Sequence, residues 1–146
     1  KKDRGVYFDF LEFERNIQKN QTPNTPAVSL LYALKAQVDR IEAEGMKPRI
    51  ARHRAMAERT WTWCDELDLE VLVQDPAFRS PTVTCVRCPD GVTGSQVAAG
   101  VRKHGFQIAT GYGHMKDETF RIGHMGEHTI DRLDALLAAL RKVLKR

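Results

Sequence analysis

The segment Phe120-Arg-Ile-Gly-His-Met-Gly126 begins as a short apolar strand and ends in glycines that carry the chain out of it. A helical pattern follows from Thr129 to about Leu144, with apolar residues at every third or fourth position. Thr129 is a suitable N-cap, because its hydroxyl can accept a hydrogen bond from a free backbone N–H. A strand that leads into an amphipathic helix predicts a sheet with helices packed against it.

The rest of the chain alternates helical and extended patterns in the same way. Helical patterns cover 27–44, 47–67 and 94–104, and short β patterns cover 70–73, 82–86 and 106–109. Because the strands are short and bracketed by helices, the expected fold class is α+β. We expect a small, largely antiparallel sheet with helices packed on one face.

For two of these helices, the sequence predicts which face is buried or exposed. The helix at 27–44 should bury one apolar face, which consists of Val28, Leu31, Leu34, Val38 and Ile41. The helix at 47–67 should expose a solvated basic face, which consists of Arg49, Arg52, His53, Arg54 and Arg59. Residues 1–25 are polar, which predicts an irregular linker. We therefore expect the folded domain to cover residues 26–146.

Composition excludes several classes of protein. The 146 residues are 42% hydrophobic and 29% charged, as in one globular domain, and no apolar run approaches the roughly 20 residues of a membrane span. The net charge is +4, with scattered basic residues and no interleaved aromatics, so we expect no nucleic acid partner. No secretory signal is visible, and an odd number of cysteines is typical of a reducing compartment, which predicts a cytoplasmic protein.

Cysteine and histidine patterns do not predict a metal site. Cys85 and Cys88 form a C-x-x-C pattern at the end of a strand, where their side chains would point to opposite faces, and Cys64 stands apart. His124 and His128 are separated by a glycine and lack a third ligand. We therefore expect three structural thiols and no bound metal.

Hydroxyls and prolines gather in the loop Thr22-Pro-Asn-Thr-Pro26, just before a helix. Thr25 would be the N-cap and Pro26 would occupy the first helical position. Free N–H groups and hydroxyls at a helix start also suit a phosphate. From the residues alone, capping and anion binding both remain open.

Two further segments have both a structural and a functional interpretation. Gly111 and Gly113 flank a tyrosine, which indicates either a surface turn or a close approach of the backbone to a ligand. Arg121 should point away from Phe120 and Ile122, because side chains alternate along a strand. Its guanidinium would bind a carboxylate in bidentate fashion, form an internal ion pair, or lie exposed.

Taken in order, three segments resemble the C-terminal part of class V (fold type I) aminotransferases that depend on pyridoxal 5′-phosphate (PLP). They are Gln21-Thr-Pro-Asn-Thr-Pro-Ala-Val-Ser-Leu-Leu-Tyr-Ala-Leu34, Gly111-Tyr-Gly113 and Thr119-Phe-Arg-Ile-Gly-His-Met-Gly126. The resemblance is to the alanine–glyoxylate, serine–glyoxylate and serine–pyruvate branch. It implies amino-group transfer between a small amino acid and a 2-oxo acid such as glyoxylate or pyruvate.

The resemblance also implies roles for individual residues. Arg121 would grip the substrate carboxylate, and Gly111 and Gly113 would contact substrate. Thr25 would reach the PLP phosphate of the neighbouring subunit in a homodimer, with Thr22 as a second candidate.

The family's Schiff-base lysine would lie upstream of Lys1, in a larger domain. The chain alone is therefore expected to hold no catalytic residue and to be inactive. The alternative from the residues is a non-catalytic α+β module that binds a partner or a small anion.

Overall fold

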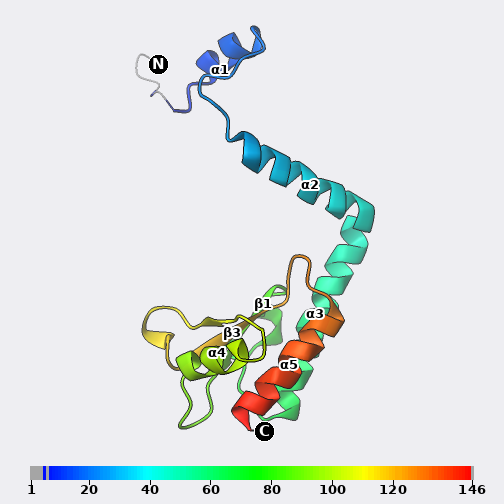
Figure 1. Cartoon of the computed structure of the whole chain (residues 1–146), viewed down its shortest axis with the longest axis vertical. Helices are drawn as coiled ribbons and strands as arrows, with labels where there is room; N and C mark the ends of the chain where they lie inside the picture. The colour runs from blue at the N-terminus through cyan, green and yellow to red at the C-terminus, as the bar shows by residue number, and fades with distance from the viewer. Residues whose placement is uncertain (1–4, 6, 146) are drawn as a thin grey trace. The chain divides into compact units, whose positions relative to one another are not determined.

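The computed structural model describes residues 5 and 7–145, so the start of the expected linker and the last residue lie outside the described part of the chain. Figure 1 shows the elements in their order along the chain. They are α1 (Phe10–Ile17), α2 (Val28–Glu44), α3 (Met46–Glu66), η1 (Pro76–Phe78), β1 (Val83–Arg87), α4 (Gly94–Arg102), β2 (Ala109–Thr110), η2 (Gly113–Met115), β3 (Thr119–Gly123) and α5 (Ile130–Leu144). None of the helices described is long and apolar enough to cross a membrane.

The sheet is antiparallel, with the strand order β1-β3-β2. This confirms the expected α+β class, and the strands predicted near 82–86 and 120–122 are present. The strand predicted at 70–73 is wrong: only Val71 forms a bridge, with Val86. The β pattern at 106–109 shrinks to Ala109–Thr110, because Phe106 and Ile108 instead pack against the core from a loop.

The core lies between one face of the sheet and the helices α3, α4 and α5, which Figure 1 shows packed around the strands. Phe120 and Ile122 project into it from β3 and are fully buried. The helices predicted at 94–104 and 129–144 are present as α4 and α5. The predicted N-cap of α5 is confirmed, because the Thr129 hydroxyl accepts a hydrogen bond from the N–H of Arg132. At the start of α4, Thr93 and Gln96 form a capping box. Burial of these apolar side chains, at roughly 25 cal/mol per Å², is the main stabilising contribution.

The chain divides into two compact units, Lys1–Ala43 and Glu44–Arg146. Within the first unit, the prediction of an irregular segment is wrong at Phe10–Ile17, which forms α1 with Asp9 as its N-cap. The segment looks polar because its aromatic residues alternate with acidic ones, yet the spacing is helical.

The predicted burial of one α2 face is also wrong for the described residues. The helix forms as expected, but Val28, Leu31, Leu34 and Val38 are 40% to 59% exposed, and none of its residues is buried. An amphipathic helix buries its apolar face only against another element. The described residues of the first unit provide no such element.

Candidate functional site

Arg121 occupies the middle of β3, the central strand of the sheet. As alternation predicts, its neighbours Phe120 and Ile122 are fully buried while Arg121 itself is half-buried on the other face. Its Nε donates a hydrogen bond to the carbonyl oxygen of Thr110, 2.8 Å away. No carboxylate among the described residues pairs with its guanidinium, so the forked Nη groups are available to a ligand.

A pocket of about 540 Å³ opens beside Arg121. Its walls come from the segment before β2, from the turn after β3 and from the first turns of α5. The lining residues are Val83, Gly105, Phe106, Gln107, Ile108, Ala109, Arg121, Gly123, Met125, His128, Arg132, Leu133 and Leu136. Apolar walls with arginine side chains at the edge suit a small organic anion.

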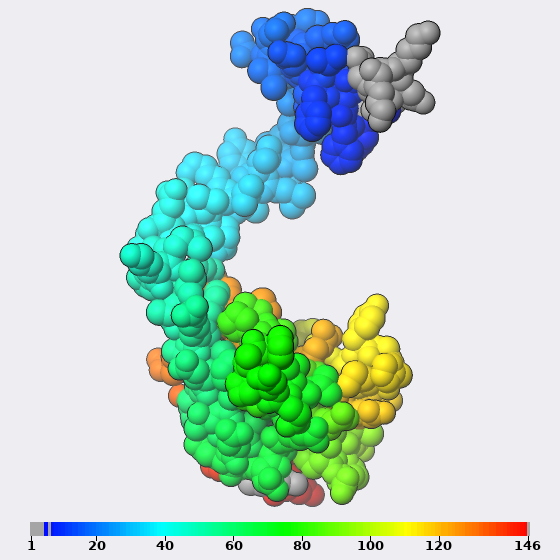
Figure 2. Space-filling model, turned by 180° about the vertical axis from the view of Figure 1, so that it is seen from behind, coloured from blue at the N-terminus to red at the C-terminus, as the bar shows by residue number. Residues whose placement is uncertain are grey.

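The two glycines of the 111–113 segment differ in what they do. Gly111 is buried, and a Cβ there would lie 2.1 Å from Thr119 Oγ1 and 2.2 Å from the carbonyl oxygen of Met115. Gly113 has a φ of +59° and open space around it, next to Tyr112, which is 86% exposed. Figure 2 shows this segment, in yellow, projecting from the surface of the second unit. Backbone packing explains Gly111 without a ligand, so its contact with substrate stays a prediction, as does that of Gly113.

Thr22 and Thr25 lie around one open depression of about 770 Å³ within the first unit, whose lining is Ile17 and the segment 20–26. The predicted N-cap is wrong: α2 begins at Val28, and the carbonyl oxygen of Ala27 accepts the hydrogen bond of Leu31 N–H. Pro26 accordingly precedes the helix instead of starting it. Thr22 donates its hydroxyl to the carbonyl oxygen of Asn24 at 2.7 Å, whereas the exposed Thr25 hydroxyl has no hydrogen bond to a described residue.

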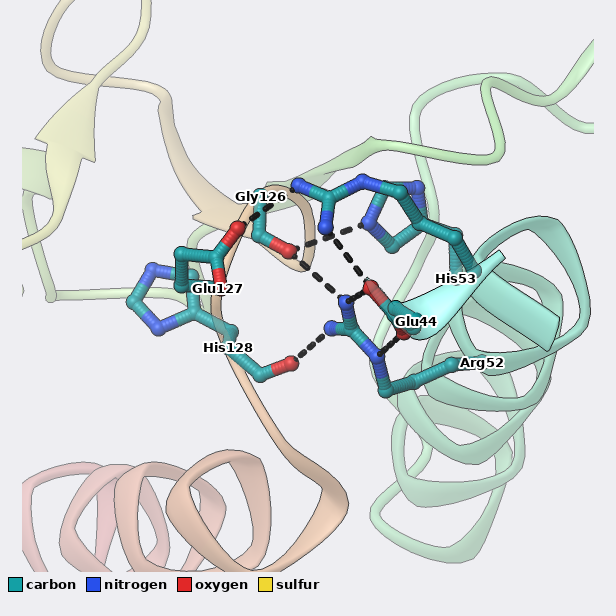
Figure 3. A network of polar contacts seen from close by, with 7 residues as sticks. Glu44, Arg52, His53, Gly126, Glu127 and His128 are labelled. Atoms are coloured by element: carbon teal, nitrogen blue, oxygen red, sulfur yellow. Dashed lines mark hydrogen bonds and ion pairs between the residues drawn. The ribbon is translucent and has the colours of Figure 1, made fainter. Parts of the chain in front are cut away.

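A network of charged side chains, which the sequence did not reveal, joins α3 to the turn after β3 (Figure 3). Arg52 makes a bidentate contact with Glu44, at 2.7 Å from Nε to Oε1 and 2.9 Å from Nη2 to Oε2. Arg49 bridges Glu44, at 2.7 Å, and Glu127, at 2.9 Å. Hydrogen bonds from Arg52, with a further contribution from Arg49, lower the pKa of Glu44 to about 2.

The expectation of a solvated face is therefore wrong for Arg49, which is buried, and for three half-buried residues, which are Arg52, His53 and Arg59. Arg54 is exposed, as expected. A signal was present in the helical spacing. Arg49 and Arg52 precede the buried Met56 by two turns and one turn, and so lie on the same stripe of the helix as the core residues. We expected the two arginines to be exposed because they are charged, although their spacing places them on the buried side of the helix.

His124 follows β3 directly and is completely buried. Its Nε2 lies 2.9 Å from Thr84 Oγ1, which also accepts a hydrogen bond from Trp61 Nε1 at 3.0 Å. Burial lowers the pKa of His124, and backbone carbonyls of His124 and Pro81 offset this only in part. The histidine is thus part of the core. The described residues contain no group of three or more His, Cys, Asp or Glu side chains that could hold a metal ion.

Comparison with known proteins identifies relatives over nearly the whole chain. An uncharacterised aminotransferase of Methanocaldococcus jannaschii is 34% identical over 97% of this chain. The alanine–glyoxylate aminotransferase of Drosophila melanogaster is 33% identical over 99% of it. The crystal structure of pyridoxamine–pyruvate aminotransferase from Mesorhizobium loti superimposes with a TM-score of 0.80 and 31% identity, over 84% of this chain and 32% of that one.

The similarity covers only part of each relative. The chain spans 37% and 38% of the lengths of the Methanocaldococcus and Drosophila proteins. No protein-family model matches the chain.

Proposed function

We propose, from the premise that this chain is a homologue of the C-terminal domain of class V (fold type I) aminotransferases, that it serves as the small domain of a PLP-dependent transaminase. The reaction would move an amino group between a small amino acid and a 2-oxo acid such as glyoxylate or pyruvate. The observation that carries the proposal is the guanidinium of Arg121, which has no carboxylate partner among the described residues and lies beside a pocket of about 540 Å³.

Arg121 is well suited to orient a substrate by its carboxylate. The hydrogen bond from its Nε to Thr110 fixes one edge of the planar guanidinium. The opposite edge keeps two parallel N–H donors, the geometry that matches both oxygens of a carboxylate. Both amino acids and 2-oxo acids carry a carboxylate next to the reacting carbon, so one arginine serves both halves of the reaction.

The threonines of the 22–26 loop fit a phosphate group. Phosphate oxygens accept hydrogen bonds, and the exposed Thr25 hydroxyl, at an open depression, has no hydrogen bond to a described residue. Thr22 already donates to Asn24, which makes it the weaker of the two donors. PLP, held there by its phosphate, would supply the electron sink that amino-group transfer requires. In our proposal Thr25 serves the cofactor of the neighbouring subunit of a homodimer.

The exposed apolar face of α2 is consistent with a longer polypeptide. Contiguous exposed apolar side chains mark surfaces that another element covers. We assign this face to the remaining two-thirds of the enzyme, which would also carry the lysine that binds PLP. We place that enzyme in the cytoplasm, because Cys64, Cys85 and Cys88 are all free.

The decisive experiment uses the complete polypeptide that contains this chain. The purified protein should show the visible absorbance band of bound PLP, and addition of an amino acid should shift that band without a second substrate. A complete polypeptide that ends in this domain yet shows no such band would favour the alternative, a non-catalytic module that binds a partner or a small anion.

A further inference from the structure

We propose that Arg52, held by Glu44, is a positioning residue: it fixes the turn 125–128, one wall of the Arg121 pocket, in the shape that receives substrate. The inference rests on the proposed function, because it concerns how that function's substrate pocket keeps its shape. Neither Arg52 nor Glu44 lines the pocket itself.

The turn has one long backbone hydrogen bond of its own, from the N–H of His128 to the carbonyl oxygen of Met125 at 3.4 Å, so contacts from α3 add to its support. It lies between the end of β3 at Gly123 and the cap of α5 at Thr129. Gly126 takes a φ of +69°, which reverses the chain there. Its carbonyl oxygen and that of His128 both accept hydrogen bonds from Arg52, the first at 3.0 Å from Nη2. Arg52 thus holds two carbonyl groups of the turn, and His53 Nε2 also lies 3.3 Å from the Gly126 oxygen (Figure 3).

Arg52 can do this because its own position is determined. Glu44 Oε1 binds Nε and Glu44 Oε2 binds Nη2, so the carboxylate sets the plane of the guanidinium. Together with the hydrogen bonds to the two carbonyl oxygens, these contacts give each of the three guanidinium nitrogens an acceptor. Arg49 adds a second link, since it contacts Glu44 and also Glu127 in the turn. A lysine in place of Arg52 would have one nitrogen on a flexible stem and would not match four acceptor contacts at once.

The segment 125–128 also shapes the pocket beside Arg121. Met125 and His128 both line it, together with Gly123 at the end of the Arg121 strand. Release of the carbonyls of Gly126 and His128 would let this wall move while Arg121 stays on its strand. Substrate affinity is sensitive to such displacement, because the groups that line a pocket fix the orientation of its ligand.

The test compares four variants of the complete, PLP-loaded polypeptide. Arg52→Met keeps an unbranched apolar stem and removes all donors, Arg52→Lys keeps the charge, and Glu44→Gln loosens the guanidinium. Arg59→Met is the matched control, because Arg59 also lies on α3 but forms its ion pairs with Asp134 of α5 and with Glu66. The measurements are amide hydrogen exchange of the turn and steady-state kinetics.

In Arg52→Met we expect faster exchange in 125–128 and a KM for the amino acid raised about tenfold, with kcat changed less, as when a binding geometry is lost. Glu44→Gln and Arg52→Lys should show smaller increases in exchange and in KM. If Arg52→Met does not fold, these two variants test whether Arg52 holds the turn. Arg59→Met should change neither quantity.

Unchanged exchange in the turn, or a loosened turn with an unchanged KM, would overturn the proposal. A wild-type polypeptide without transaminase activity would refute the proposed function instead, and exchange would still report whether Arg52 holds the turn.

Discussion

Arg121 lies directly opposite Cys85 on β1 and opposite Ala109 on β2, so both of its cross-strand neighbours are small. Side chains that face each other across antiparallel strands are within contact distance. Larger neighbours at these two positions would cover the guanidinium. Their small size leaves it open towards a ligand, which is the arrangement that a carboxylate-binding arginine requires.

Replacement of Arg121 by methionine should therefore weaken substrate binding in the complete enzyme. Loss of one partner of a desolvated, charge-assisted contact costs about 2–4 kcal/mol. We expect this loss in kcat/KM for the amino acid, measured by steady-state kinetics. Arg87→Met is the matched control, because Arg87 lies on β1 and pairs with Glu70 at the surface. Equal effects of the two substitutions would refute the role of Arg121.

Gly111→Ala should destabilise the fold without any ligand present. The added methyl group would meet Thr119 Oγ1 and the Met115 carbonyl within 2.2 Å, and overpacking of this kind costs about 1–3 kcal/mol. Gly113→Ala adds the same methyl group in open space, so only the cost of its positive φ, about 1–2 kcal/mol, applies. Chemical denaturation of both variants measures the difference. A larger loss for Gly113→Ala would show that packing does not explain Gly111.

Glu44 should make stability depend on pH in the acid range. Its pKa is about 2 in the folded protein against an ordinary value of 4.5, chiefly because Arg52 hydrogen-bonds to it. Its contribution is complete above pH 4.5 and is lost as the pH falls towards 2. Urea unfolding of the wild type and of Glu44→Gln should therefore give free energies that converge over this range. Parallel pH profiles would contradict the ion network.

His124 should affect stability at a higher pH. Burial holds its pKa below the ordinary 6.5, so the unfolded chain takes up a proton before the folded protein does. The free energy of unfolding should fall as the pH drops below about 6.5, and it should level off once the pH is below the folded-state pKa. NMR titration of the imidazole resonances checks this directly, and a His124 midpoint at or above 6.5 would contradict its burial.

Thr84→Val should destabilise the core although it preserves the shape of the side chain. The Thr84 hydroxyl is the partner of both Trp61 Nε1 and His124 Nε2. Its removal takes this partner from the buried His124 Nε2 and from Trp61 Nε1 of the half-buried indole, at a cost of about 1–3 kcal/mol. Thermal or urea unfolding measures the loss. Thr62→Val, at a surface position of α3, is the control and should have little effect.

Local patterns were enough to predict β1, β3, the helices α3 to α5 and the face of β3 on which Arg121 lies. The helical period of α5 and the alternation of side chains around Arg121 depend only on residues close together in the sequence. They are therefore visible without knowledge of the tertiary contacts. The same reasoning failed for Thr25, because the start of α2 depends on where the backbone turns after two prolines and not on which residue could cap it.

Only the tertiary structure revealed what Arg49 and Arg52 do. Their partner Glu127 and the two turn carbonyls lie more than seventy positions along the chain, and no local pattern records a contact over that separation. The sequence by itself determined the strand, the helix and the face on which Arg121 lies. The tertiary structure decided which charged side chains hold the turn and which remain exposed to solvent, because this depends on the distant backbone groups that lie beside each side chain.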